Sequence, residues 1–185
     1  MINQIKKLSD TFAKVLESCP EITYIGDGVL RTKVKDVTLE EGIILGNKLK
    51  EILKRYRGIT GYGRGLAAPQ IGEGGAVFVT FVDDDFKVYI NPKIVSHSKG
   101  LNLFRESCLS RGYLSVDVKR PVSIEIKYVN ENGDIKSEKA DGFLARLLQH
   151  EYDHMEGIIN IDKAEPASIE FMSDDPLKAK LRDVK

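Results

Sequence analysis

The sequence predicts an α+β fold in which short, mainly antiparallel strands surround a buried C-terminal helix. Apolar residues recur at spacings of three and four near both ends of the chain, a pattern typical of helices. Short apolar runs, some alternating with polar residues, lie between these segments, and Asn132-Gly133 has the composition of a hairpin turn. The chain has 185 residues, enough for one hydrophobic core, so we expect a single domain over residues 1–185.

Two helices are expected before the first strand. The first is amphipathic from the start of the chain and ends at Pro20. The second begins at a capping box formed by Thr38 and Glu41, and Gly58 is expected to end it. Residues 58–75 then contain seven glycines, which predicts a loop whose backbone needs unusual freedom or close approach to another group.

The last predicted helix follows Asp141, a plausible N-cap, and ends at Gly157. It is apolar around most of its circumference, so we expect it to be buried. Residues from about 165 to 185 form a polar tail, expected to be a surface helix or partly disordered. We predict strands over four segments: Ala76–Val82, Lys87–Ile90, Pro121–Val129 and Ile158–Ile161.

Composition excludes several classes of protein. Lys and Arg total 28, as do Asp and Glu, so no basic excess favours a nucleic-acid or membrane-surface partner. The charged first twenty residues lack the apolar core of a signal peptide, and no apolar run is long enough to span a bilayer. Two cysteines, Cys19 and Cys108, are too few for a disulfide scaffold. We expect a cytoplasmic monomer that binds neither nucleic acid nor membrane.

The sequence His150-Glu151-Tyr152-Asp153-His154 is the strongest chemical signal. Residues four apart on a helix share one face, so the two imidazoles can bind one metal ion. The intervening Glu151 can then accept a proton from a water molecule. A chance match of this length is on the order of one per cent in a chain with so few histidines.

A catalytic metal site of this type needs a third protein ligand. Cys108 and Glu170 are the candidates, and we favour Cys108 because it lies in a polar stretch where an inert core cysteine would be out of place. His97 is interpreted as a solvated loop residue. Cys19, next to a predicted helix end, is interpreted as a small apolar filler.

Three motifs together resemble the peptide deformylase family. They are Gly63 to Gln70 (GRGLAAPQ), Glu106 to Ser110 (ESCLS) and His150 to Gly157 (HEYDHMEG), in the order that the family has them. The resemblance extends from the first helix to about residue 164 and does not assign the tail. It implies the α+β fold of that family, with the HExxH helix at its centre.

The resemblance also implies a role for each matching residue. Glu151 corresponds to the general base and acid, and the Gln70 side chain and Leu109 N–H correspond to the donors that stabilise the oxyanion. The metal ligands would be Cys108, His150 and His154. The substrate-binding residues would be Gly63, Arg64 and Gly65 of the loop, and Phe143 and Leu147, which could instead be core residues.

The implied activity is hydrolysis of an amide. Members of the family remove formate from the N-terminal formyl-methionine of nascent polypeptides, so the expected partner is an N-formylated nascent chain, with the ribosome as a candidate site of action. The expected cofactor is one divalent ion, Fe(II), with Zn(II) or Ni(II) as alternatives in purified protein. The chain would then be a single catalytic domain with an unassigned tail.

Three positions depart from the family pattern. Ser107 stands where glycine is usual, so the backbone there should accept a non-glycine conformation. Arg64 replaces an aliphatic residue, so its guanidinium should either point to solvent or select a different substrate. Arg111-Gly112 replaces Val-Pro, which should loosen a substrate-binding edge.

Other positions have supporting or undecided roles. Glu106 and Arg120 resemble a family pair that braces the cysteine loop. The alternative is that they are two exposed charges that contribute little to stability. Gln149 either supports the metal ligands or lies on the helix surface.

Three other functions remain open on sequence grounds. A zinc endopeptidase of the HExxH type would take Glu170 as its third ligand. A deformylase-like protein could have an altered substrate or no turnover, given Ser107 and Arg64. A nucleotide-binding module is a weak alternative, because the glycine-rich loop lacks the phosphate-loop pattern.

Overall fold

The computed structural model describes residues 2–171 and 182–183. It contains three α-helices, α1 (Ile2–Ser18), α2 (Leu39–Thr60) and α3 (Gly142–Met155). Its longer strands are β1 (Gly65–Ala67), β2 (Val77–Val82), β3 (Asp85–His97), β4 (Leu101–Ser107), β5 (Leu114–Pro121), β6 (Ser123–Val129) and β7 (Ile135–Asp141). The short strands β8 (Glu170–Phe171) and β9 (Arg182–Asp183) follow α3, and short 3₁₀ helices include η2 (Ala68–Ile71), η3 (Leu109–Arg111) and η4 (Asn160–Lys163).

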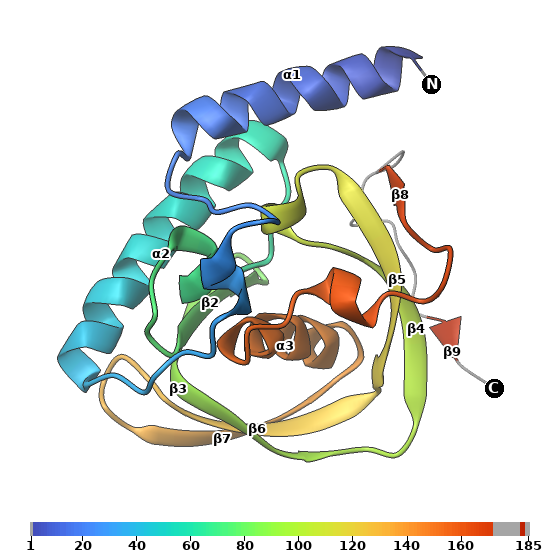
Figure 1. Cartoon of the computed structure of the whole chain (residues 1–185). Coiled ribbons are helices and arrows are strands. Elements are labelled where there is room, and N and C mark those ends of the chain that lie inside the picture. Colours follow the sequence, from blue (N-terminus) through green and yellow to red (C-terminus); the bar gives the residue numbers. More distant parts are fainter. Residues whose placement is uncertain (1, 172–181, 184–185) are drawn as a thin grey trace.

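The strands form two antiparallel sheets, as the sequence predicted. One sheet has the order β1-β2-β3-β6-β7, and the other has the order β8-β5-β4-β9. Helix α3 lies at the centre of the molecule, with β6 and β7 on one side and β4 and β5 on another (Figure 1). The predicted hairpin turn at Asn132-Gly133 connects β6 and β7, and Gly133 has a φ of +83° that suits glycine.

The five-stranded sheet separates two apolar cores because successive side chains of a strand point to opposite faces. Val79 and Val88 pack on the side of α2, whereas Phe78 and Tyr89 pack on the side of α3. The α2 core includes Leu49, Ile52 and Leu53 of that helix, and the α3 core includes Ala145 and Leu148. Apolar burial on both faces therefore fixes where α3 lies.

Helix α2 approaches strand β3 closely through two glycines one turn apart. A Cβ atom on Gly42 would lie 2.6 Å from Cγ2 of Ile90, and one on Gly46 would lie 2.7 Å from Cγ1 of Val88. Thr38 and Glu41 form the predicted capping box at the start of this helix. Gly58 was wrongly expected to end it, because the helix continues to Thr60 and Gly61 forms the left-handed cap with φ +76°.

Two further expectations about elements were wrong. Residues 158–161 do not form a strand: a turn leads into η4, where Asp162 accepts a hydrogen bond from Ile159 N–H at 2.9 Å. The segment predicted as Pro121–Val129 spans two elements, since Pro121 ends β5 and β6 begins at Ser123. Strands β1, β4, β5 and β7 were not predicted.

The predicted tail lies partly outside the described residues. Its described part includes β8, which pairs with β5, and β9, which pairs with β4. No helix in the described ranges combines the length and the apolar character that crossing a membrane requires.

Candidate metal centre and pocket

Three separate segments bring the predicted site residues to one place. Helix α3 carries His150, Glu151 and His154, while Cys108 follows the last residue of β4 and Gln70 lies in η2 directly after β1. One pocket is lined by most of the predicted residues, among them Gly63, Arg64, Gly65, Gln70, Cys108, Leu109, Phe143, Leu147, His150 and Glu151. Residues far apart in sequence therefore share one cavity.

The thiol and the two imidazoles have the arrangement of a metal-binding group. One ligand atom from each of Cys108, His150 and His154 lies within 4.8 Å of the other two. Sγ of Cys108 is 3.5 Å from Nε2 of His154, and all three side chains are buried. Two nitrogens and one sulfur are suitable donors for Zn(II) or Fe(II), and three protein ligands leave a position open for water.

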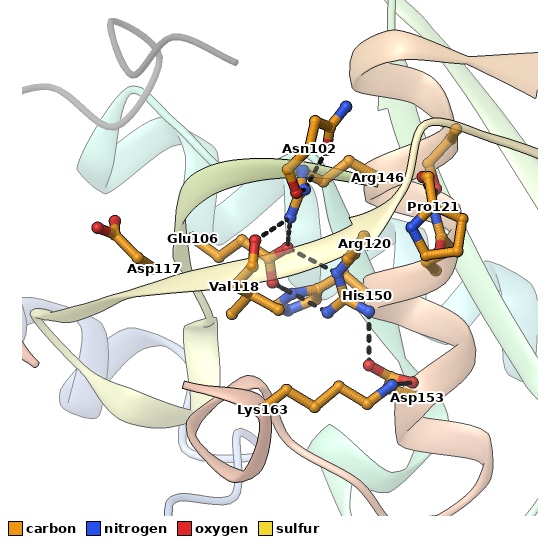
Figure 2. A network of polar contacts seen from close by, with 12 residues as sticks. Asn102, Glu106, Asp117, Val118, Arg120, Pro121, Arg146, His150, Asp153 and Lys163 are labelled. Carbon is orange, nitrogen blue, oxygen red and sulfur yellow. Dashed lines mark hydrogen bonds and ion pairs between the residues drawn. The ribbon is translucent and has the colours of Figure 1, made fainter. Parts of the chain in front are cut away.

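A buried carboxylate orients one of the two imidazoles. Oε2 of Glu106 lies 2.9 Å from Nδ1 of His150, which leaves Nε2 of that ring to face the metal-binding group. Arg120 donates to both oxygens of Glu106, at 2.7 Å from Nε and 3.0 Å from Nη2 (Figure 2). The expected contact between Glu106 and Arg120 is thus present, and it is buried rather than exposed.

Four more residues extend this network, and the sequence did not assign them a role. Arg146 donates to Glu106 Oε1 at 2.5 Å and to the backbone oxygen of Asn102 at 2.9 Å. Arg120 Nη1 donates to Asp153 at 2.7 Å, and Lys163 donates to the other oxygen of the same carboxylate at 2.6 Å. Arg146 had a usable signal, because it is a charged residue one turn before His150 on a helix that was expected to be buried.

The charges of the network shift the ionisation of the site. Burial would raise the pKa of Glu106, but Arg120 and His150 outweigh it and hold that pKa well below 4.5. Burial would likewise raise the pKa of the Cys108 thiol, yet His154 and His150 bring it well below its ordinary value. Burial opposes protonation of His150, but Cys108 and Glu106 raise its pKa to about 10. Cys108 is therefore held as a thiolate, the form that binds metals.

Glu151 has a different environment from Glu106. Burial raises its pKa to about 7, with the neighbouring histidines acting in the opposite direction. Its Oε2 is buried and has no hydrogen-bond partner among the described residues. A Cβ atom on Gly65 would lie 2.2 Å from Glu151 Oε1, so glycine is required where β1 passes this carboxylate. An uncompensated carboxyl that titrates near neutrality is suited to proton transfer.

Gln70 presents its amide nitrogen to the site. Its Oε1 accepts a hydrogen bond from Ala67 N–H at 2.8 Å, which fixes the orientation of the amide. Nε2 then lies 3.3 Å from Cys108 Sγ and 3.2 Å from Ser110 Oγ. The backbone of Leu109 begins η3 directly after Cys108, so its N–H and the Gln70 amide adjoin the same sulfur.

Ser107 and Arg111 are accommodated in different ways. Ser107 pairs with Ser115 in the β4–β5 ladder and has no positive φ, so the backbone accepts a side chain there, as expected. Arg111 is buried, and its Nη2 donates to the backbone oxygen of Glu106 at 2.9 Å. This bond ties the turn to β4 and acts against the loosening expected from the replacement of Val-Pro.

The remaining candidates lie outside the metal-binding group. Glu170 is in β8, where it pairs with Arg105, so the structure does not support it as the third ligand. His97 is solvent-exposed as expected but ends β3 rather than lying in a loop. Cys19 is fully buried in the α2 core, which confirms its interpretation as an apolar filler. Gln149 donates to the backbone oxygens of Pro121 and Ala145 and so joins α3 to β5.

Helix α3, enclosed by antiparallel sheets, carries two histidines and a buried glutamate, and a cysteine from another segment lies beside them. This arrangement defines the class of metal-dependent hydrolases of the HExxH type. Residues 19–169 match the family described as polypeptide deformylase. The chain belongs to that family.

Individual members of the family are similar to this protein over most of its length. The peptide deformylase of Treponema pallidum strain Nichols is 36% identical over 143 residues, which cover 77% of this chain and 86% of the relative. The crystal structure of the Thermotoga maritima peptide deformylase has a TM-score of 0.71 at 34% identity, covering 78% of this chain and 97% of that one. A Synechococcus elongatus peptide deformylase in complex with actinonin has a TM-score of 0.70 at 35% identity, covering 79% of each chain.

Proposed function

We propose that this chain hydrolyses the formyl group from the N-terminal formyl-methionine of nascent polypeptides and releases formate. The observation that carries the proposal is the grouping of Cys108, His150 and His154 within 4.8 Å, beside the buried carboxyl of Glu151. The family match over residues 19–169 supports the same reaction.

The donor set suits one divalent ion held by Cys108, His150 and His154. When bound, such an ion makes water acidic enough to react at neutral pH and polarises the formyl carbonyl. The thiolate character of Cys108 favours a transition metal over magnesium or calcium. We propose Fe(II) as the native ion, on the resemblance to the family, and expect air to reduce activity because a thiolate and a ferrous ion both oxidise.

The protein groups divide the proton transfer and charge stabilisation between them. Glu151 accepts the proton of the attacking water and later donates it to the departing amine, which leaves poorly unless protonated. Gln70 Nε2 and Leu109 N–H would donate to the oxygen on which negative charge develops. Loss of one such donor in a hydrolase costs about 2.7–4 kcal/mol of transition-state stabilisation.

The pocket provides room for the first residue of the substrate. Phe143 and Leu147 line it two turns and one turn before His150, respectively, and offer apolar surface to a methionine side chain. Gly63 and Gly65 would lie along the peptide backbone of the substrate, in the segment where the lack of a side chain on Gly65 leaves room for the carboxylate of Glu151. Leu147 is also buried, which is compatible with both of the roles that the sequence left open.

Formate release tests the proposal directly. Protein purified anaerobically and loaded with iron should release formate from formyl-Met-Ala-Ser, and acetyl-Met-Ala-Ser should remain intact. Iron and nickel samples with full metal content but no formate release would contradict an enzymatic function. Metal analysis of the anaerobic protein would identify the ion.

We propose the following setting for the reaction. The substrate is a nascent polypeptide with a free formylated end, and the protein binds it in the cytoplasm and at the ribosome. The protein acts as a monomer with one catalytic domain. Cosedimentation with translating ribosomes and light scattering of the purified protein test these points.

A further inference from the structure

The Arg64 side of the pocket carries positive charge that no ion pair among the described residues neutralises. Arg64 lines the pocket between Gly63 and Gly65, and its Nε is buried without a hydrogen-bond partner among the described residues. Its Nη1 lies 3.5 Å from the backbone oxygen of Phe81, at the outer limit of a hydrogen bond. Most of the hydrogen-bonding capacity of this guanidinium is therefore unused.

A second guanidinium lies behind the first. Arg57 donates to the backbone oxygen of Gly63 at 2.7 Å, and its guanidinium carbon lies 3.9 Å from the centre of the Phe81 ring. Burial and the charge of Arg64 lower the pKa of Arg57, with Asp84 acting in the opposite direction. Within the described ranges, neither Arg57 nor Arg64 forms an ion pair.

The other arginines of the pocket are compensated. Arg105 pairs with Asp117 and Glu170, and Arg146 pairs with Glu106. Among the arginines that line the pocket, Arg64 is thus the one without an ion pair in the described ranges, and it lies next to the segment that passes Glu151. Burying part of a guanidinium without a partner costs free energy, which a ligand carboxylate would recover.

We infer that Arg64, with Arg57 behind it, selects formylated peptides that carry an acidic side chain at the second or third residue. This inference rests on the proposed function and names the substrate class of the same site. Arg64 would donate to the carboxylate, and Arg57 would hold the Gly63 backbone and add to the positive field. A lysine at the same substrate position would be disfavoured by repulsion.

The test compares five formylated peptides with amidated C-termini, so that only side chains carry charge. They are formyl-Met-Ala-Ser, formyl-Met-Asp-Ser, formyl-Met-Lys-Ser, formyl-Met-Ala-Asp and formyl-Met-Ala-Lys. At the responsible position, kcat/KM for Asp should exceed that for Lys by about tenfold or more. Arg64→Gln should bring this ratio close to one, and Arg64→Glu should invert it.

A matched control and a variant-free measurement complete the test. Arg55→Gln should leave the ratio unchanged, because Arg55 lies on the same helix as Arg57 but is paired with Glu21. Added salt should lower the ratio in the unaltered protein, so the inference is testable even if the Arg64 variants fold poorly. Formate release with no preference for Asp, or a preference unchanged in Arg64→Gln, overturns this inference alone. No formate from any of the five peptides overturns the proposed function and this inference with it.

Discussion

His150 Nδ1 and Glu106 Oε2 lie 2.9 Å apart, and both side chains are buried. The same carboxylate receives hydrogen bonds from Arg120 and Arg146, so one side chain pairs with two guanidiniums and orients one imidazole. Glu106 thereby links the interior charge balance of the protein to the geometry of the candidate metal site.

Glu106→Gln should weaken metal binding by about 10- to 100-fold. The amide cannot balance the charges of Arg120 and Arg146, and it holds His150 less firmly. Loss of a buried partner should also lower the free energy of unfolding by about 3 kcal/mol. Chelator competition measures the first effect and urea denaturation measures the second. Glu156→Gln is the control, because Glu156 pairs with Lys33 at the surface; equal affinity in both variants would contradict the orienting role.

Cys108→Ala should abolish stable metal binding, because two imidazoles alone are a weak set of ligands. Glu170→Ala should retain the ion, since Glu170 pairs with Arg105 outside the metal-binding group. Metal content after gel filtration measures both. The opposite pattern, with the ion lost only in Glu170→Ala, would favour the endopeptidase interpretation.

Glu151→Gln should stabilise the metal-free protein, and increasingly so as the pH rises. The carboxyl has an ordinary pKa of 4.5 and a folded-state pKa of about 7, so the folded state favours its protonated form. As the pH rises from about 4.5 to 7, the protein with Glu151 therefore loses unfolding free energy relative to the variant with a neutral amide, by at most about 3 kcal/mol. Urea denaturation at pH 5 and pH 8 gives the difference.

The comparison for Glu151→Gln is Glu40→Gln, at an exposed position in the first turn of α2. Its effect should change little between the two pH values. A Glu151→Gln effect that is the same at pH 5 and pH 8 would show that burial does not raise this pKa. The variant should also bind metal while losing activity by several orders of magnitude.

The sequence predicted the parts of the site that local geometry determines. His150 and His154 share a helix face because they are four residues apart, whatever the rest of the fold does. The polar neighbours of Cys108 in the sequence identified it, rather than Cys19, as the candidate metal ligand, and Cys19 is buried in the core. Those neighbours also led us to expect Cys108 beside the histidines, whereas the approach of the Gln70 segment was expected only from the resemblance to a family.

The supporting network beyond Glu106 and Arg120 was missed because strand β4 was missed. Its inward-facing residues are Asn102, Phe104 and Glu106, so polar side chains occupy the face that a strand normally makes apolar. The pairing of β4 with β5 places Asn102 opposite Arg120 and Glu106 opposite Val116, and no spacing in the sequence shows this register. Strand β7 was missed for a different reason: Ala140 is its one buried residue, so its sequence shows no apolar face.

Helix α1 contacts the turn that follows Cys108, although it precedes the matched residues 19–169. The Phe12 ring forms edge-to-face contacts with Tyr24 and Tyr113, at centroid distances of 5.3 and 5.6 Å. A Cβ atom on Gly112, whose φ is +62°, would lie 3.2 Å from this ring. Phe12 thus packs directly on the end of η3, the turn that begins at Leu109.

Phe12→Ala should therefore loosen the turn at residues 109–113 while costing about 1–3 kcal/mol of unfolding free energy. Hydrogen exchange in that segment should become faster than in the β6–β7 hairpin of the same variant, because the lost contact is local. Leu16→Ala is the matched control, since Leu16 lies on the same helix with 45% of its surface exposed. If both variants exchange alike at residues 109–113, α1 does not brace the turn that holds Leu109 beside Cys108.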